Sequence, residues 1–287
     1  MSYQSVFKPG LFTGQTVIVT GGGSGMGRCT AHELANLGAK VLITGRKQEK
    51  LDKVLAEIKE DGGTAVSYAF DIREEDAVKA SIKQMLADHG TIHGLVNNAG
   101  GQYPMPLAMI NKKGWDAVVG NNLTGGFLVA RELFNQCMKK SGGAIVNMLA
   151  DMWRGMPGMG HSGAARAGML NFTETAALEW ASSGVRVNAV APGWIASSGM
   201  DHYDPVFAKE VIPMLASKAP AQRMGEEAEV SSAIVFLLSP AAAYISGACI
   251  TIDGGSSLNS KIFPMSPHNK STIYQGFHRA VKPKAVK

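Results

Sequence analysis

Short apolar runs and longer amphipathic segments alternate along the chain, and this pattern predicts strands and helices in turn. The runs are almost wholly apolar, which is typical of strands buried on both faces of a parallel sheet. The predicted strands are residues 16–20, 40–44, 64–69, 92–97, 143–149, 185–190 and 248–252. The segments between them favour helices. The predicted helices are residues 25–37, 48–60, 74–89, 114–139, 160–183 and 225–238.

This alternation predicts an α/β fold, a doubly wound seven-stranded parallel sheet with helices on both faces. We expect residues 1–255 to form one domain and residues 256–287 to form a basic tail. The segment 194–225 fits the rhythm poorly because Pro205, Pro213 and Pro220 interrupt it. It follows the sixth predicted strand and should lie over the carboxyl edge of the sheet, where ligands bind. We interpret it as a substrate lid.

Composition narrows the class of protein. A hydrophobic content of 45% and a charged content of 18% are ordinary for a packed globular domain. Cys29, Cys137 and Cys249 are far apart and form no CxxC pair, so we expect neither a disulfide framework nor a metal site. Residues 1–14 contain no apolar core, so we expect no signal peptide. Residues 230–252 are uncharged, but Pro240 and Gly247 favour a helix, a turn and a strand over a membrane span.

Charge is concentrated at the end of the chain. The formal net charge is +5, and six of the 28 Lys and Arg residues follow Asp253, together with none of the 23 Asp and Glu residues. The preceding part is therefore close to neutral. We expect a solvated tail that is disordered or docks on a neighbouring subunit, with a specific anion site as the alternative. No segment resembles a nucleic-acid-binding module.

A glycine-rich turn directly follows the first predicted strand. Gly21, Gly25 and Gly27 give the spacing TGxxxGxG, and a predicted helix begins within it. Glycines let backbone N–H groups approach a pyrophosphate, and the N-terminus of the following helix favours its negative charge. Strand, turn and helix in this order predict a dinucleotide site.

The end of the second predicted strand bears on the choice of dinucleotide. An enzyme that uses NAD usually carries an acidic residue here, which binds the ribose 2′-hydroxyl. This chain has Gly45 followed by Arg46 and Lys47. Arg46, helped by Lys47 and Arg28, can bind a 2′-phosphate through charge-assisted hydrogen bonds, and the alternative is a solvated turn. We predict NADP as the cofactor.

Further motifs follow in a fixed order: Asp71-Ile72, Asn97-Asn98-Ala99-Gly100, Asn122-Leu123-Thr124-Gly125 and Pro192-Gly193. Together with the glycine-rich turn, they make residues 13–255 resemble the short-chain dehydrogenase/reductase family. The resemblance implies a single Rossmann-like domain that forms a homotetramer or a dimer. It implies that Asp71 lies at the adenine, that Asn97 and Gly100 line the cofactor cleft, and that Ile195 and Ser197 lie at the nicotinamide end.

The turn, the strand end and the resemblance together give a set of expected cofactor-binding residues. They are Gly21, Ser24, Gly25, Met26, Gly27, Arg46, Lys47, Asp71, Ile72, Asn98, Ala99, Gly100, Arg166, Pro192, Gly193, Ile195 and Ser197. The resemblance also implies a catalytic role for Asn122, which would support a water molecule. We expect Ser162 and Arg166 to complete the catalytic set.

Ser162 and Arg166 mark a departure from the family. They stand where the family has Tyr and Lys, and Leu149 and Ala150 stand where it has a catalytic Ser. A serine hydroxyl ionises far less readily than a phenol, whose pKa is about 10, so Ser162 is a poor proton donor to an alkoxide. The stretch from His161 to Gly168 is similar to the peroxisomal type of trans-2-enoyl-CoA reductase.

These observations lead to one preferred function and two alternatives. We expect an NADPH-dependent oxidoreductase of fatty acid metabolism that acts on a CH–CH group, the double bond of an α,β-unsaturated acyl-CoA. The first alternative is another activated substrate, either a branched or terpenoid acyl-CoA or a carbonyl compound, with Tyr103 or His161 as the proton donor. The second is an NADP-binding protein without catalysis. The chain ends in Ala285-Val286-Lys287, unlike a peroxisomal address, so we expect a cytoplasmic location.

Overall fold

The computed structural model describes residues 2–202, 205–259 and 265–286, and its centre is a parallel sheet of seven strands. The strands lie in the order β3-β2-β1-β4-β5-β6-β9. Their bounds are β1 Thr16–Thr20, β2 Lys40–Gly45, β3 Thr64–Ala69, β4 Gly94–Asn97, β5 Gly143–Met148, β6 Val185–Pro192 and β9 Cys249–Ile252. Each predicted strand is present. The order reverses next to β1, and this reversal opens a crevice at the carboxyl edge of the sheet.

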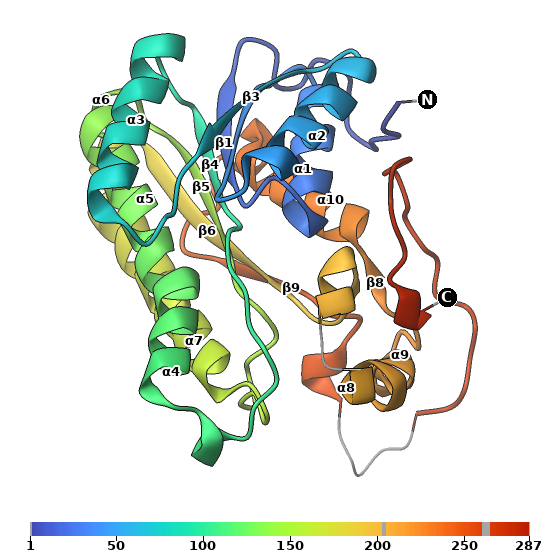
Figure 1. Ribbon diagram of the computed structural model, residues 1–287. Helices are drawn as coiled ribbons and strands as arrows, with labels where there is room; N and C mark the ends of the chain where they lie inside the picture. The colour runs from blue at the N-terminus through green and yellow to red at the C-terminus, as the bar shows by residue number, and fades with distance from the viewer. Residues whose placement is uncertain (1, 203–204, 260–264, 287) are drawn as a thin grey trace.

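Two layers of helices cover the sheet, as predicted. Figure 1 shows α1, α2 and α10 on one face and α3, α5 and α7 on the other. The bounds are α1 Gly25–Asn36, α2 Gln48–Glu60, α3 Glu75–His89, α4 Lys112–Val119, α5 Gly125–Leu133, α6 Lys139–Ser141, α7 Gly160–Glu179 and α10 Glu227–Leu238. The uncharged stretch 230–252 is therefore a helix followed by a strand. Within the described residues, no helix is long and apolar enough to cross a bilayer.

Side chains of the central strands alternate between two apolar cores. On β1, Val17 and Val19 pack with α1, α2 and α10, whereas Ile18 packs with α3 and α5. All three are buried. The period of two in a strand sends neighbouring side chains to opposite faces, so a strand with helices on both sides is apolar throughout. This explains why the apolar runs located the strands.

The predicted helix 114–139 is a longer run with two wider turns inside it. It begins at α4, where the Asn111 side chain accepts the N–H of Gly114 at 2.8 Å, and it continues through α6. The wider turns are the π-helical segments η2 (Gly120–Thr124) and η3 (Phe134–Met138). A π turn inserts one residue into a helix and shifts the side chains that follow. The first of these turns carries Asn122.

The expected lid has more regular structure than its prolines indicate. It contains β7 (Ile195–Ala196), η5 (Ser198–His202), α8 (Pro205–Glu210), α9 (Ile212–Lys218) and β8 (Gly225–Glu226). β7 pairs in parallel with β8, and Ile195 lies opposite Gly225. This pairing closes the segment at its base. Figure 1 shows α8 and α9 beyond the lower end of the sheet.

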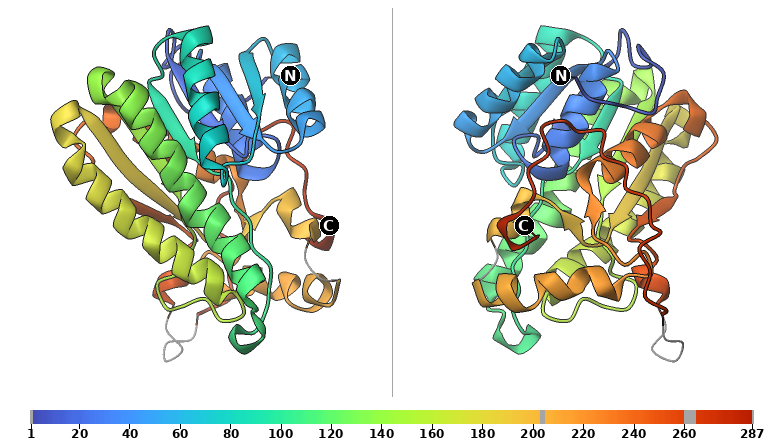
Figure 2. Two further views of the ribbon diagram at one scale, coloured as in Figure 1. Left: turned by 60° about the vertical axis from the view of Figure 1, so that its left-hand side comes forward. Right: turned by 90° about the vertical axis from the view of Figure 1, so that its right-hand side faces the viewer.

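The described part of the tail packs on its own chain, so the structure differs from the expectation of disorder. Phe277 is buried against Tyr3, Cys29 and Ala228. Arg279 pairs with Glu60 at 2.7 Å and with Asp61 at 2.8 Å. The tail passes beside the N-terminus and returns to end next to the lid (Figure 2). Burial of the Phe277 ring and pairing of the basic side chain with acids of α2 supply the reason for docking.

Candidate active site

A cleft of about 570 Å³ opens at the carboxyl ends of the central strands. It is lined by the glycine-rich turn, the ends of β2 and β5, and the loops that follow β3, β4 and β6. Most of the expected cofactor-binding residues meet here: Gly21, Ser24, Gly25, Met26, Arg46, Lys47, Asp71, Ile72, Asn98, Ala99, Gly100, Arg166, Pro192, Gly193, Ile195 and Ser197. The lining also contains residues that the sequence did not single out as site residues, among them Lys50, Gln102, Asn121, Trp194 and Met200.

The turn after β1 has the geometry that a phosphate site requires. Gly21 and Gly25 have positive φ angles of 67° and 58°, a region that other residues rarely adopt. Gly27 lies beneath the turn instead of on the cleft surface. A Cβ atom at Gly27 would lie 2.5 Å from the Gly21 carbonyl oxygen and would also collide with the Asn98 side chain. The third glycine thus lets α1 begin directly against the turn.

The loop after β4 is fixed to the end of β1. Thr20 Oγ1 accepts the backbone N–H groups of Asn98 at 3.0 Å and of Ala99 at 2.9 Å, and Asn98 Nδ2 donates to the Thr20 carbonyl at 2.8 Å. Asn97 was expected to line the cleft, and the structure places it elsewhere. Its Nδ2 donates to the Gly126 carbonyl and to Asn147 Oδ1, both at 3.0 Å, so it joins the strands to α5.

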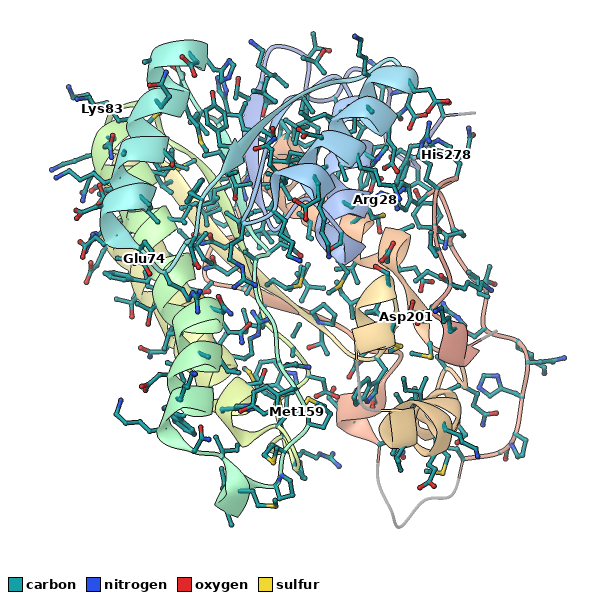
Figure 3. All side chains as sticks on the ribbon, in the orientation of Figure 1. Arg28, Glu74, Lys83, Met159, Asp201 and His278 are labelled. Carbon is teal, nitrogen blue, oxygen red and sulfur yellow. The ribbon has the colours of Figure 1, made fainter. Side chains whose placement is uncertain are left out.

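Positive side chains gather at the end of β2. Arg46, Lys47 and Lys50 line the cleft and are exposed. Arg28, which was expected to help them, is held elsewhere, because its Nε donates to Glu57 at 2.7 Å. Figure 3 shows Arg28 on the side of the molecule where the tail residue His278 lies. The 2′-phosphate contact predicted from sequence therefore falls to Arg46 and Lys47, with Lys50 beside them.

Asp71 lines the same part of the cleft and is paired with Arg73. The Arg73 side chain donates to both carboxylate oxygens of Asp71, with Nη2 to Oδ2 at 2.5 Å. Hydrogen bonds from Arg73 hold the pKa of Asp71 below its usual value. Asp71 is therefore an ionised acceptor at neutral pH, as a contact to an adenine amino group requires.

Arg166 brings a buried positive charge to the inner wall of the cleft. It lies on α7, and its Nη1 donates to the Met148 carbonyl at the end of β5. Burial lowers the pKa of Arg166 to about 10, so the guanidinium stays protonated at neutral pH. Its Nε atom is buried and has no hydrogen-bond partner among the described residues. An unpaired buried donor of this kind fits a ligand oxygen, such as a ribose hydroxyl.

Ser162 lies behind the cleft wall. It is fully buried, and its Oγ donates to Oε1 of Gln102 at 2.5 Å. Gln102 is half-buried in the loop after β4 and lines the cleft. In the described part of the chain, Ser162 does not belong to the cleft lining. The structure therefore differs from the expectation that Ser162 meets the substrate, because Gln102 lies in between.

Asn122 is also buried behind the cleft wall. Its Nδ2 donates to the Gly101 carbonyl at 2.7 Å and to the Val118 carbonyl at 2.9 Å. Its Oδ1 accepts the Gly101 N–H at 3.0 Å. The amide of Asn122 thus holds the loop after β4 at the residue before Gln102. The π turn η2 supplies the shift in the helix that places Asn122 there.

Two other candidate proton donors lie outside the lining that the described residues form. His161 is fully buried, and its Nδ1 accepts the Ser162 N–H at 3.0 Å. Tyr103 packs edge-on against the His161 ring, with ring centroids 4.8 Å apart. The Tyr103 hydroxyl lies against Gly114 on α4, where a Cβ atom would collide with it. Neither residue belongs to the cleft lining that the described residues form.

The methionines around Trp153 do not belong to the cleft lining that the described residues form. Met152 and Met159 are buried, and Met159 directly precedes α7 (Figure 3). The loop that carries Met152 and Met159 contacts the loop after β4, where the Met105 N–H donates to the Gly158 carbonyl at 2.6 Å. The apolar part of the described cleft lining comes instead from Met148, Leu149, Trp194 and Met200.

A family model described as enoyl-(acyl carrier protein) reductase, which is one of the short-chain dehydrogenase/reductase models, matches residues 13–257. A solved structure of the citronellol catabolism dehydrogenase (AtuB) of Pseudomonas aeruginosa PAO1 is 62% identical, with a TM-score of 0.80. The match covers 89% of this chain and all of that chain.

Two curated relatives differ in the reaction that their names state. A 3-oxoacyl-[acyl-carrier-protein] reductase of Synechocystis is 38% identical over 247 residues, which is 85% of this chain and 97% of the relative. A peroxisomal 2,4-dienoyl-CoA reductase of Danio rerio is 31% identical over 266 residues, which is 90% of this chain and 86% of the relative. One name states carbonyl reduction and the other the reduction of a conjugated double bond.

Proposed function

Because this chain belongs to the short-chain dehydrogenase/reductase family, we propose that it uses NADPH to reduce the α,β double bond of an acyl-CoA thioester. The observation that carries this proposal is the inner wall of the cleft. Arg166 and Gln102 offer a positive charge and a polar amide there, and none of the described lining residues is a tyrosine. The cleft thus holds donors for a developing negative charge and no phenol to protonate an alkoxide.

The residues of the cleft fit a phosphorylated dinucleotide. Gly21 and Gly25 bring the backbone and the N-terminus of α1 to a pyrophosphate. Arg46 and Lys47 would bind the 2′-phosphate, and the unpartnered Nε of Arg166 would bind a ribose hydroxyl. The chemistry that bound NADPH supplies is a hydride for the β-carbon of the substrate.

The remaining chemistry belongs to the protein and to water. Negative charge develops on the thioester oxygen as the β-carbon gains its hydrogen. Oriented hydrogen-bond donors and a fixed positive charge stabilise such an enolate oxygen without giving up a proton. Arg166 keeps its charge at neutral pH and lines the same wall. The α-carbon then takes its proton from water.

Reduction of a simple ketone makes a different demand on the site. The product oxygen is an alkoxide, which needs a proton from an acid of suitable pKa. Ser162 is a weak acid and lies behind Gln102, and His161 is buried away from the described lining. We therefore expect ketones to be poor substrates, although a carbonyl reductase is among the relatives.

A branched, terpenoid acyl chain is a second candidate for the substrate. The relative that is 62% identical is named for citronellol catabolism, and citronellol is a branched isoprenoid alcohol. Met148, Leu149, Trp194 and Met200 supply an apolar lining that could take such a chain. Methionine adapts to irregular apolar shapes, which favours a methyl-branched group here.

A substrate panel tests the proposed function. NADPH oxidation is measured with straight and methyl-branched trans-2-enoyl-CoA esters, with matched ketones and with a 3-oxoacyl-CoA. We expect turnover of the enoyl esters and little turnover of the ketones, and a preference for branched esters would support the second candidate. Faster turnover of the carbonyl substrates contradicts the proposal. NADPH binding without turnover of any substrate favours a role without catalysis.

A further inference from the structure

We propose that the Gln102 side-chain amide donates a hydrogen bond to the thioester oxygen of the substrate, and that Ser162 and Asn122 act by positioning it. This inference rests on the proposed function and names the donor that the reaction needs. Ser162 does not line the cleft itself, but it forms a hydrogen bond to Gln102, which does. We call this pair of side chains the relay, in which Ser162 positions Gln102 and Gln102 contacts the substrate. Gln102 is the member of that relay that lines the cleft.

The bond from Ser162 fixes which end of the amide serves the cleft. Ser162 Oγ donates to Oε1 of Gln102 at 2.5 Å, so the carbonyl end of the amide is engaged inside the protein. The N–H groups on Nε2 have no acceptor among the described residues. A primary amide carries two N–H donors, and these are left for an acceptor in the cleft.

The backbone beneath Gln102 is fixed as well. Asn122 forms a two-way amide contact with the neighbouring Gly101, donating to its carbonyl at 2.7 Å and accepting its N–H at 3.0 Å. Gly100 lies where a Cβ atom would meet both Asn122 and Arg166, 2.8 Å from Arg166 Nη2. The loop is thus tightly packed up to the residue that carries the amide. Such preorganisation is what makes a donor effective against charge that develops during a reaction.

The two cleft donors have complementary chemistry. Arg166 is charged and buried, and one of its nitrogen atoms already donates to the Met148 carbonyl. Gln102 is neutral and half-buried. A neutral amide can donate to an enolate oxygen and cannot protonate it, which matches a reaction whose proton comes from water. The relay therefore explains how a site without the phenol can still bind a carbonyl oxygen.

The first test exchanges Gln102 itself. Gln102→Leu removes both amide groups, and Gln102→Glu keeps the shape and the acceptor for Ser162 but removes the N–H donors. For either variant we expect kcat with a trans-2-enoyl-CoA to fall about 10²-fold, with a much smaller change in KM, as for loss of an oxyanion donor. The dissociation constant for NADPH should stay unchanged. Gln84→Leu, the same exchange on the outer surface of α3, is the matched control and should keep full activity.

The second test asks whether Ser162 acts through Gln102. Ser162→Ala leaves the amide unfixed and should lower kcat about tenfold, less than the loss of the amide itself. The double variant Ser162→Ala with Gln102→Leu should then be no slower than Gln102→Leu alone, because the positioned group is already missing. If the two losses multiply, Ser162 acts independently, and the relay is wrong.

The outcomes separate this inference from the proposed function. A parent protein that reduces enoyl esters while both Gln102 variants keep its kcat rejects the role of Gln102 and leaves the function standing. A parent protein that binds NADPH but reduces no enoyl ester rejects both. If Gln102→Leu fails to fold, judged by its thermal transition and NADPH binding, the result with Gln102→Glu decides.

Discussion

At the scale of single residues, two positive charges of the cleft differ in how they can contribute to binding. Arg166 is buried, and its Nε has no hydrogen-bond partner among the described residues, so the fold itself holds this donor ready for a ligand. Arg46 is exposed at the rim and lies in water when no ligand is bound. An exposed side chain adds little to stability, whereas its contact to a phosphate is charge-assisted and selective. Arg46 is therefore the residue whose removal should change cofactor choice and little else.

We expect Arg46→Ala to raise the dissociation constant for NADPH much more than that for NADH. Loss of a charge-assisted contact costs about 1.5–3 kcal/mol, which corresponds to roughly a ten- to hundredfold change. Titration of both cofactors by calorimetry measures the two constants. Lys83→Ala on the outer surface of α3 removes a charge far from the turn and should change neither. Equal affinity of the parent protein for both cofactors would show that the cations at the end of β2 do not select NADP.

Glu227, at the start of α10, makes stability depend on pH. Burial raises the pKa of Glu227 from 4.5 to about 7. Between these values the folded protein binds a proton that the unfolded chain has lost, so the free energy of unfolding falls as pH rises through this window. Glu227→Gln removes this dependence. Urea unfolding at about pH 5 and about pH 8 should show a smaller fall for the variant than for the parent. An identical fall in both proteins would mean that Glu227 titrates at an ordinary value.

Most of the residues that the sequence assigned to the site lie at or near the cleft. The sequence was less successful in separating those that line the cleft from those buried behind its wall, such as Ser162 and Asn122. Turn chemistry located Gly21, and the charge pattern pointed to Arg46, because both signals are local. Ser162 and Asn122 were selected by family resemblance. A resemblance aligns positions along the sequence, but it does not show which other side chains lie between those residues and the cleft. Gln102 had only a weak signal, a polar residue after Gly100-Gly101. Its contact with Ser162 joins residues 60 positions apart, which no local pattern contains.

At the scale of elements, the tail connects parts of the molecule that are distant in sequence. Its middle packs on α1 and α2 through Phe277, Arg279 and the cation–π contact of Arg28, whose Cζ lies 4.9 Å from the Phe277 ring centroid. Its end reaches the lid, where the Lys284 N–H donates to Asp201 at 2.9 Å. Val286 packs beside the apolar cluster of α9. The tail therefore contacts both the lid and the helices α1 and α2, which are far from it in sequence.

We expect Phe277→Ala to release the tail. Removal of a buried phenylalanine ring costs about 3–5 kcal/mol in a rigid core, and undocking of the tail sets an upper limit on that loss. Limited proteolysis followed by mass spectrometry should therefore show faster cleavage within residues 256–287. Ile273→Ala, at a residue of the same tail that is 51% exposed, is the matched control and should be cleaved like the parent. Equal cleavage of all three proteins would contradict tight docking.

The short helices of the lid could not be predicted from the sequence. Helices α8 and α9 have six and seven residues, too few to show a clear apolar period or to be stable alone. They depend on tertiary contacts such as that of Val286 and on the pairing of Ile195 with Gly225. The prolines indicated an irregular segment, and they gave no sign of the contacts that fold its short helices and strands.

At the scale of the whole molecule, the architecture follows from apolar patterning because each strand is covered on both faces. The outer surface of the α5 and α7 layer carries apolar side chains that packing within one chain does not explain. Phe127 on α5 is 36% exposed and Leu178 on α7 is 81% exposed. Phe172 lies edge-on to Phe127, with ring centroids 5.8 Å apart. Exposed apolar groups on two adjacent long helices favour burial against another copy of the chain.

From the family resemblance together with this exposed layer, we expect a symmetric homo-oligomer and predict a tetramer. Light scattering coupled to size-exclusion chromatography should give a mass about four times that of the 30.3 kDa chain. Leu178→Glu should lower this mass if the α5 and α7 layer is an interface, and Tyr244→Glu is the control at another exposed apolar residue. A parent mass near that of one chain would contradict the expectation.

In the proposed reaction, hydride goes to a carbon–carbon double bond and not to a carbonyl carbon. The most direct measurement is the fate of deuterium from NADPH labelled at the hydride-donating position, with an equimolar mixture of a trans-2-enoyl-CoA and a 3-oxoacyl-CoA. Mass spectrometry and NMR locate the label in the products. We predict a saturated acyl-CoA with deuterium on the β-carbon. Deuterium on the carbinol carbon of a 3-hydroxyacyl-CoA, with none in a saturated ester, would contradict it.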